Sequence, residues 1–286
     1  FQKEELFLKK DIKKLEEIQN LLPSDFLNEW KRFLDTEKKK MVLYFDKITG
    51  KPSIIEGEGL YRILDYENIK LDQVKEASTI FLNNYPKIFS ISPSIISLNH
   101  SSSGGIDYVY SLHYNIVYNG IKVEKAHLSF HLNHGAIVQI GQEYICDTIY
   151  ELDPNPNITS EDALNILWNY IGGKTEDDEI LESGKISIIP VLVQNALAGN
   201  YEIGKGLKYK LVYTIVFKRN GEVGTWEAKV DAKTGEILSF IDKNYYGEIK
   251  GGVYKYDGAS SEVIEPFPFC DYSTNLYSDI NGYFPG

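Results

Sequence analysis

Residues Ile106–Ile140 read IDYVYSLHYNIVYNGIKVEKAHLSFHLNHGAIVQI, and this stretch decides the fold that we predict. β-Branched and aromatic residues alternate in it with polar ones, which is typical of strands that bury one face of a sheet. Two turn signals interrupt the stretch, Asn119-Gly120 and His134-Gly135. Because Asn-Gly favours the positive φ angles of a tight hairpin turn, we predict an antiparallel meander of three strands here.

Length and composition restrict the classes of protein that fit. The chain has 286 residues, which is enough for two domains that each bury a core. Its contents of 43% hydrophobic and 25% charged residues are those of an ordinary globular protein. The net charge of −11 argues against nucleic acid as a partner, because such binding depends on Lys and Arg at phosphates. No apolar run approaches the ~20 residues that span a bilayer, so we predict no transmembrane segment.

The first segment, residues 1–40, is predicted to be a helical arm. An amphipathic helix over residues 3–22 ends at Pro23, and Ser24 begins a second, shorter helix. The apolar stripe of the first helix consists of Leu8, Ile12, Leu15 and Leu22. Two roles stay open for this arm: packing on the protein's own sheet, or docking and oligomerisation.

Two α+β units are expected to follow. Residues 41–146 contain a strand at Met41–Phe45, a helix at Leu71–Ile88 and the meander, and residues 147–158, rich in Pro, Asp and Asn, are predicted to be a linker. Residues 159–244 contain one helix, capped by Thr159 or Ser160, and several strands. These strands are expected at Ile186–Val193, Tyr209–Lys218, Thr225–Val230 and Ile237–Ile241. The predicted fold class is therefore α+β, with two small domains whose helices pack on antiparallel sheets.

The final segment, residues 245–286, is predicted to be an extended tail. Glycine and proline punctuate it, and its last residues are typical of a hairpin that opens a further β module. We therefore expect Gly286 not to be the end of the natural gene product.

Residues that could perform chemistry are sparse. His127 and His131 lie on one strand, about 13 Å apart at the usual rise per residue, which is too far for both to bind one zinc ion. His134 lies in a turn, so we interpret all three histidines as structural and predict no metal site. The chain has no H-E-x-x-H, G-x-S-x-G or P-loop motif. We therefore predict no catalytic residues, no cofactor and no enzymatic activity.

The chain has two cysteines, Cys146 and Cys270. They could form one disulfide in an oxidising compartment, or both could stay free, because the sequence determines neither pairing nor redox state. The chain begins at Phe1, which fits a mature protein whose signal peptide has been removed, although an expressed fragment would begin in the same way.

Several motifs resemble a known pair of domains. The first group resembles the fungalysin/thermolysin propeptide (FTP) domain, and the second resembles a PepSY domain. The FTP-like motifs are Gly50-Lys-Pro-Ser-Ile-Ile-Glu-Gly57, Ala77-Ser-Thr-Ile-Phe-Leu-Asn-Asn84, Val117-Tyr-Asn-Gly-Ile-Lys-Val123 and Leu128-Ser-Phe-His-Leu-Asn133. The PepSY-like motifs are Thr159–Ile171 and Trp226–Ile241, the latter containing Val230-Asp-Ala-Lys-Thr-Gly-Glu-Ile237. Val117, Ile121 and His134 depart from the FTP pattern, which usually has Gln or Thr, Pro and Asp at these places.

The resemblance implies a pro-region of a secreted, thermolysin-like zinc metallopeptidase. Such a module acts in cis as an intramolecular chaperone and as an inhibitor of the peptidase domain. The tail Tyr245–Pro268 is the segment expected to enter the catalytic cleft, because it is extended and aromatic.

An alternative function belongs to a different class. The same pair of domains could be a structural subunit of an extracellular or cell-surface assembly, in which copies exchange β-strands and build a filament. A head-to-tail contact that does not close gives such a filament. The sequence does not decide between a peptidase partner and further copies of the chain.

Overall fold

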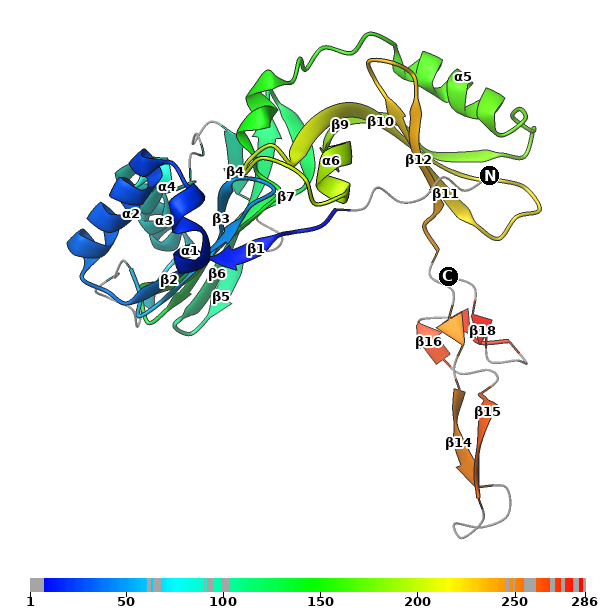
Figure 1. The fold of residues 1–286 in the computed structure, drawn as a ribbon. Coiled ribbons are helices and arrows are strands. Elements are labelled where there is room, and N and C mark those ends of the chain that lie inside the picture. The colour runs from blue at the N-terminus through cyan, green and yellow to red at the C-terminus, as the bar shows by residue number, and fades with distance from the viewer. Residues whose placement is uncertain are drawn as a thin grey trace.

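The computed structural model describes residues 8–60, 63, 68–89, 91, 95–98, 103–244, 247–248, 250–254, 261–267, 271–273, 276–279 and 283–284. It confirms the predicted α+β class, because helices lie on a sheet whose strands are nearly all antiparallel (Figure 1).

One sheet of twelve strands runs through the part of the chain up to residue 242. Its main path is β1-β2-β3-β8-β7-β9-β10-β11-β12, and β6 lies beside β7 and pairs with β4 and β5. The strands are β1 (Ile12–Lys14), β2 (Met41–Asp46), β3 (Lys51–Gly57), β4 (Ile96–Leu98), β5 (Gly104–Ile106), β6 (Val109–Tyr118), β7 (Ile121–Asn133), β8 (Ala136–Glu143), β9 (Glu179–Leu192), β10 (Leu207–Lys218), β11 (Thr225–Asp231) and β12 (Ile237–Asp242). We call β1–β8 with α1–α4 the N-terminal lobe, and α5 with β9–β12 the C-terminal lobe.

The predicted meander is confirmed as β6, β7 and β8. Its two turns contain the residues that signalled them: Asn119 and His134 have φ angles of 49° and 47°. Two irregularities were not predicted: a one-residue shift at Val138 of β8, and a larger one in β7. Asn115 pairs with His127 but Ile116 pairs with Val123, so three residues of β7 bulge out of the ladder between these pairs.

The bulge marks the place where the two lobes join. On the N-terminal side of the bulge, β7 does not pair with β8. There Val123 pairs in parallel with Ile188 of β9. This single parallel contact makes one continuous sheet of two parts that the sequence predicts as separate.

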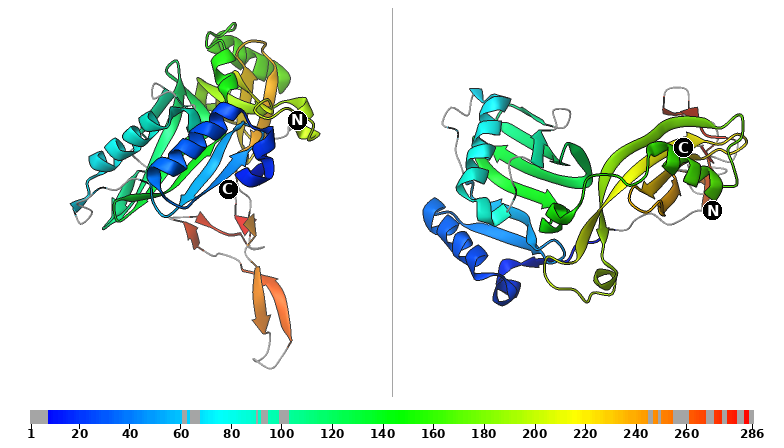
Figure 2. Two further views of the ribbon diagram at one scale, coloured as in Figure 1. Left: turned by 60° about the vertical axis from the view of Figure 1, so that its left-hand side comes forward. Right: turned by 90° about the horizontal axis from the view of Figure 1, so that it is seen from above.

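Helices cover one face of each lobe (Figures 1 and 2). They are α1 (Leu15–Ile18), α2 (Ser24–Glu37), α3 (Leu71–Asn84), α4 (Pro86–Phe89), α5 (Ser160–Tyr170) and α6 (Gln194–Leu197). In the N-terminal lobe, Phe81 of α3 contacts Phe33 and Phe130 with ring centroids 6.0 and 6.2 Å apart. In the C-terminal lobe, Trp168 of α5 contacts Phe217 of β10 at 5.1 Å.

The predicted helix over residues 3–22 is wrong in the part that the structure describes. Residues 12–14 form β1 on the edge of β2, and only the short helices α1 and η1 (Gln19–Leu21) follow. Residues 12–14 form a strand instead of a helix because the edge of β2 offers backbone hydrogen-bond partners. Such a tertiary contact overrides helix propensity. Leu15, Ile18 and Leu22 are nevertheless buried, so this segment packs on the protein's own sheet.

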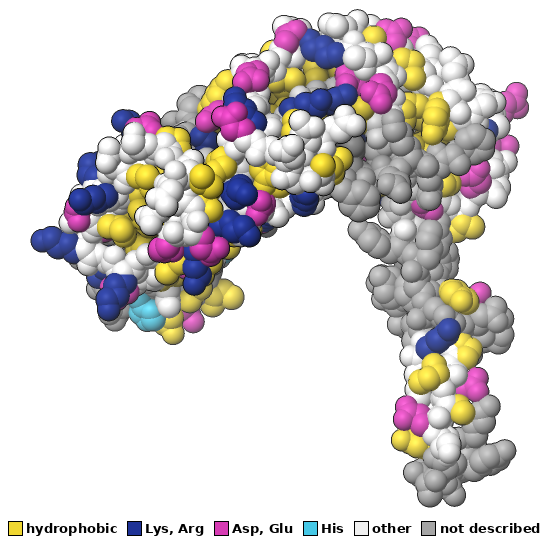
Figure 3. Space-filling model, viewed as in Figure 1, with side chains coloured by type: hydrophobic (Ala, Val, Ile, Leu, Met, Phe, Trp, Pro, Cys, Tyr) yellow, Lys and Arg dark blue, Asp and Glu magenta, His cyan; other side chains and the backbone are white. Residues whose placement is uncertain are grey.

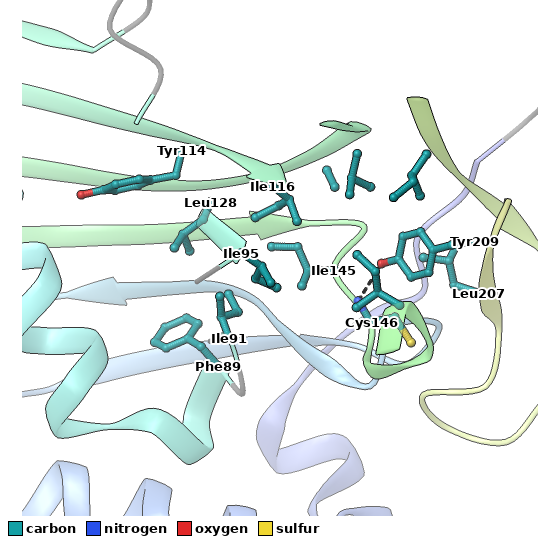
Figure 4. Packing of buried hydrophobic residues seen from close by; sticks show 14 of the residues in the cluster. Phe89, Ile91, Ile95, Tyr114, Ile116, Leu128, Ile145, Cys146, Leu207 and Tyr209 are labelled. Atoms are coloured by element: carbon teal, nitrogen blue, oxygen red, sulfur yellow. Dashed lines mark hydrogen bonds between the residues drawn. The ribbon is translucent and has the colours of Figure 1, made fainter. Parts of the chain in front are cut away.

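The core is shared between the lobes. Figure 4 shows Phe89, Ile116 and Leu128 of the N-terminal lobe in one cluster with Leu207 and Tyr209 of β10. Between them, the Tyr209 hydroxyl donates a hydrogen bond to the Tyr144 carbonyl at 2.7 Å and accepts one from the Cys146 amide at 2.9 Å.

The predicted linker is partly folded. Its first residues form the 3-10 helix η4 (Asp147–Glu151), in which Ile149 is buried and Thr148 donates a hydrogen bond to the Leu207 carbonyl at 2.9 Å. The helix η4 therefore packs against β10, and the sheet itself connects the two lobes through β7 and β9. The boundaries predicted at residues 40, 146, 158 and 244 stay predictions.

The tail forms short strand pairs where the structure describes it. These are β14 (Lys250–Tyr254) with β15 (Glu262–Pro266), β13 (Gly247–Glu248) with β18 (Tyr283–Phe284), and β16 (Asp271–Ser273) with β17 (Leu276–Tyr277). The orange β14–β15 hairpin projects away from both lobes (Figure 1; Figure 2, left).

Candidate functional site

The face of the C-terminal lobe opposite α5 carries a groove of about 370 Å³ at the junction of the lobes. Successive side chains of a strand point to opposite faces, and Phe217 of β10 contacts Trp168 of α5. Thr214, three residues earlier on the same strand, therefore lies on the other face, where it lines the groove. We call this feature the junction groove.

The bulge of β7 supplies the N-terminal lobe's part of this groove. It places Glu124 beside Ser187 of β9 and Lys229 of β11, both from the C-terminal lobe. One Glu124 oxygen accepts a hydrogen bond from the Ser187 hydroxyl at 2.6 Å, and the other accepts one from the Lys229 ammonium at 2.7 Å. These three side chains connect the lobes by direct polar contacts.

Glu124 is held as a carboxylate. Burial by itself raises the pKa of Glu124, but the hydrogen bond and positive charge of Lys229, with the Ser187 hydroxyl, outweigh it and hold the pKa below its usual value. Lys229 is itself well covered, with 12% of its side chain exposed, and it also lies 3.6 Å from Glu227. The pair is therefore a partly buried ion pair that two lobes share.

The remainder of the groove has a mixed lining, in which the buried hydroxyl side chains of Ser187, Thr214 and Ser239 lie among apolar and charged ones. Ile189 and Ile241 supply apolar surface, and Lys122 and Lys185 stand among the charged side chains. Leu8, ahead of β1, reaches into the same groove. A lining of apolar side chains, hydroxyls and charged groups can hold an extended polypeptide by side-chain, hydrogen-bond and charge contacts.

The residues ahead of β1 also tie the lobes together. We call Leu8–Asp11 the N-terminal strap. Lys9 donates a hydrogen bond to the Leu197 carbonyl of α6 at 3.2 Å, and Lys10 forms an ion pair with Glu143 of β8. Burial raises the pKa of Asp11, but hydrogen bonds from Tyr201 at 2.7 Å and Lys47 at 3.2 Å outweigh it, so the pKa is lowered overall.

The three histidines considered as metal ligands each contact a different residue. His127 Nε2 is 3.8 Å from a Glu143 oxygen, and His131 Nδ1 is 2.9 Å from the Ser111 hydroxyl. The His134 ring stacks on Tyr108 with centroids 3.7 Å apart. Within the residues that the structure describes, no group of three or more His, Cys, Asp or Glu side chains could hold a metal ion.

Cys146 is buried, and its thiol donates a hydrogen bond to the Gly204 carbonyl at 3.3 Å. Cys270 lies outside the described residues, so a disulfide between the two stays a prediction. The tail Tyr245–Pro268, expected to enter a peptidase cleft, is described only at residues 247–248, 250–254 and 261–267.

Sequence reasoning missed Glu124, Ser187 and Lys229 as a connected set. A signal for the bulge was present, because the apolar residues of β7 change parity between Val123 and Leu128. A shift of one residue moves side chains to the opposite face, so such a change indicates a bulge. Nothing local indicated that Ser187 and Lys229 would lie beside it.

Comparisons with known proteins support one part of the predicted resemblance. A family model described as "Peptidase propeptide and YPEB domain", PepSY, matches residues 157–240, so the chain contains a PepSY domain there. The comparisons give no support for an FTP domain, which stays a prediction for residues 41–146. None of the curated proteins is a significant match to the sequence.

Among solved structures, the Bacillus megaterium YpeB C-terminal domain is similar to this chain at 12% identity, with a TM-score of 0.31. The match covers 77% of this chain and 97% of that domain. Similarity at this level carries no argument about function. Separately, none of the helices in the described residues is long and apolar enough to span a membrane.

Proposed function

We propose that this chain is a secreted, non-catalytic pro-region module that binds a thermolysin-like zinc metallopeptidase domain in cis, assists its folding and inhibits it. The observation that carries this proposal is the PepSY domain at residues 157–240, a peptidase-propeptide family. The sheet of that domain bears the junction groove, whose apolar, hydroxyl and charged side chains can contact an extended polypeptide segment.

The physical basis of such a role is selective binding. A module that binds the folded peptidase and not the unfolded one stabilises the folded state by mass action. The same contact keeps the enzyme inactive while it lasts. The shared core and the Glu124–Lys229 pair favour this role, because a rigid binding surface loses little conformational entropy when the partner binds.

The experiment is inhibition of a thermolysin-like peptidase, ideally the cognate one, by purified residues 1–286. We expect inhibition at sub-micromolar concentration. Reversing two rim charges, Lys122→Glu with Lys185→Glu, should weaken inhibition about tenfold or more, because charges at a rim contribute to recognition. Lys174→Glu, an exposed lysine outside the groove, is the matched control and should inhibit like the parent chain. Absence of inhibition of the cognate peptidase by the parent chain would refute the proposal.

A second candidate is a subunit of an extracellular assembly. Two observations favour it: in the described part of the chain β12 pairs only with β11, and the β14–β15 hairpin exposes apolar residues. Tyr254 is 53% exposed and Ile264 is 65% exposed. A strand at the end of a sheet and an apolar hairpin are the two parts that strand exchange between copies uses.

This candidate predicts concentration-dependent elongated particles of residues 1–286 in negative-stain microscopy and light scattering. Ile264→Ser should reduce them, whereas Leu197→Ser, which removes a side chain of similar exposure on α6, should not. A monomer at high concentration with both termini intact would refute it.

A further inference from the structure

The helices of the N-terminal lobe cover one face of its sheet, and two histidines lie on the other face. Phe130 of β7 contacts Phe81 of α3 and Tyr114 of β6, with ring centroids 6.2 Å apart in both pairs, so these side chains point toward the helices. Because successive side chains of a strand point to opposite faces, His113 of β6 and His131 of β7 point away from the helices. We call the side of the sheet that carries them the outer face. Both histidines are partly exposed there.

The two histidines meet across neighbouring strands. His113 pairs with Ser129, and His131 pairs with Ser111, which makes the histidines diagonal neighbours in the ladder. Aromatic side chains at such diagonal positions are within reach of each other. The ring centroids are 5.9 Å apart, and the ring planes are inclined at 78°. Sequence reasoning compared only histidines of one strand, so it did not reveal this pair.

The separation of the two rings fits a shared metal ion. A zinc ion lies about 2 Å from each imidazole nitrogen and roughly 3 Å from each ring centroid, so two rings that share it have centroids roughly 5–6 Å apart. The distance of 5.9 Å between His113 and His131 lies within this range. Because both side chains are partly exposed, rotation of the rings can direct both lone pairs at one ion.

His131 is oriented for ligation by its neighbour on β6. Its Nδ1 lies 2.9 Å from the Ser111 hydroxyl, and donation of the Nδ1 proton to this oxygen leaves the Nε2 lone pair available. Histidine ligands of metals commonly hold their second ring nitrogen in such a hydrogen bond. Burial and, after it, the charge of His113 lower the pKa of His131, so the ring is neutral at pH 7, as a metal ligand must be.

The charge of the surroundings is compatible with a bound cation. His131 pairs on its other side with Gln139 of β8, whose amide donates a hydrogen bond to the Glu56 carboxylate at 3.1 Å. The whole chain carries a net charge of −11. On the side of the N-terminal lobe seen in Figure 3, basic side chains are interspersed with acidic ones. The net negative charge of the chain therefore favours the approach of a divalent cation.

We propose that His113 and His131 form a binding site for a divalent transition-metal ion on the outer face. Imidazole nitrogen suits zinc, copper and nickel, and zinc is the probe that we select. The described residues supply no third His, Cys, Asp or Glu ligand here, so water completes the coordination and the ion can exchange. This proposal replaces the sequence-based prediction of no metal site, which considered only His127, His131 and His134.

The test is titration of the metal-free full chain with zinc chloride at pH 7.5, measured by calorimetry. We expect one site with a dissociation constant in the micromolar range. His113→Gln and His131→Gln should each weaken binding about tenfold or more, and Ser111→Ala should weaken it less, because it removes only the orienting hydrogen bond. Binding should also weaken at pH 5.5, because protons compete with zinc for both rings.

The matched controls are His127→Gln and His134→Gln, each of which removes a histidine from the same lobe. His127 lies 3.8 Å from Glu143, and the His134 ring stacks on Tyr108. Both control variants should bind zinc like the parent chain. An equal loss of binding in the controls would overturn the proposal, because the effect would then not belong to the pair.

A second measurement uses the parent chain alone and does not depend on how well a variant folds. In nuclear magnetic resonance spectra, zinc should shift the imidazole nitrogen signals of His113 and His131 and leave those of His127 and His134 in place. No zinc binding by the parent chain, or full binding in the double variant His113→Gln with His131→Gln, would overturn the proposal. The two histidines do not line the junction groove, so these results are independent of the inhibition experiment.

Discussion

At the scale of single residues, Asp46 shows how a buried charge is accommodated. Asp46 ends β2 and is only 4% exposed. Burial raises the pKa of Asp46, and hydrogen bonds from the Asp11 amide at 3.0 Å, the Ile48 amide at 3.1 Å and the Thr49 hydroxyl at 3.4 Å only partly offset this. Its main role is therefore to accept hydrogen bonds that close the β2–β3 turn and attach the N-terminal strap.

An asparagine can accept the two amide hydrogen bonds without placing a charge in the interior. We therefore expect Asp46→Asn to change the free energy of unfolding by less than about 1 kcal/mol, and Asp46→Ala to lower it by about 1–3 kcal/mol. Urea unfolding at pH 7 measures both. Equal losses in the two variants would show that the negative charge matters more than the acceptor geometry.

His131 gives the fold a dependence on pH. Burial, with a smaller contribution from His113, lowers the pKa of His131. Above about pH 6.5 the His131 side chain is neutral in both the folded and the unfolded state. As the pH falls below this value, the unfolded chain binds a proton before the folded protein does, so the free energy of unfolding decreases. The decrease ends once the pH is below the lowered pKa of the folded state. We expect the decrease in unfolding free energy between pH 7.5 and pH 5.5 to be smaller in His131→Gln than in the parent chain. Parallel pH profiles would contradict this assignment.

At the scale of elements, hairpins were predictable and the path of β7 was not. The meander depends on period-two alternation and on two turn signals, both of which are local in sequence. The strand at Ile12–Lys14 depends on the edge of β2, about thirty residues further along the chain, and its helical periodicity gave no sign of it. Three of the four strands after α5 were predicted to within two residues of their observed bounds, for the same reason as the meander. The first half of β9 was missed, because that strand begins at Glu179 and the prediction began at Ile186.

The junction groove was hidden from the sequence because its lining comes from five strands, β7 and β9–β12, and from Leu8. Glu124 meets Ser187 and Lys229 only because the β7 bulge directs Val123 to Ile188. The residues were present in polar positions typical of any solvated strand face. Only the parallel contact between the lobes makes them a site.

The Glu124–Lys229 pair should therefore couple the lobes energetically. Removing one partner leaves a half-buried charge without its counterion, so Glu124→Ala and Lys229→Met should each lower the free energy of unfolding by about 1–3 kcal/mol. The double variant should lose less than the sum, with a coupling energy of about 0.5–3 kcal/mol. Lys210→Met is a matched control, because Lys210 pairs with Asp231 at 2.7 Å within the C-terminal lobe, and its loss should add to that of Glu124→Ala. Strict additivity of the Glu124 and Lys229 losses would contradict a direct interaction.

At the scale of the whole molecule, the lobes behave as one packed body. They share the twelve-stranded sheet, the core of Figure 4, the N-terminal strap and a contact between the β2–β3 turn and the loop before β10. In that last contact the Gly204 and Gly206 amides donate hydrogen bonds to the Lys47 and Ile48 carbonyls at 2.9 and 3.1 Å. The sequence predicts two domains because it shows two sets of helices and strands, whereas the contacts between them are all long-range.

The closest backbone approach in this contact, Gly50 against Gly204, provides a test of that unity. Gly50 has a φ of +69°, and a Cβ there would lie 2.7 Å from the Gly204 Cα, whereas Gly120 has a φ of +80° with open space around it. Gly120→Ala should therefore lower the free energy of unfolding by about 1 kcal/mol, which is the backbone strain alone. Gly50→Ala should lower it by that strain and by about 1–3 kcal/mol more, because the loop at Gly204 must be displaced. If the lobes are one cooperative body, calorimetry of Gly50→Ala should show a single unfolding transition for both lobes at a lower temperature, because weakening the joint weakens both halves. Two resolved transitions, one unchanged from the parent protein, would show instead that each lobe is stable without the other and that the shared core contributes little.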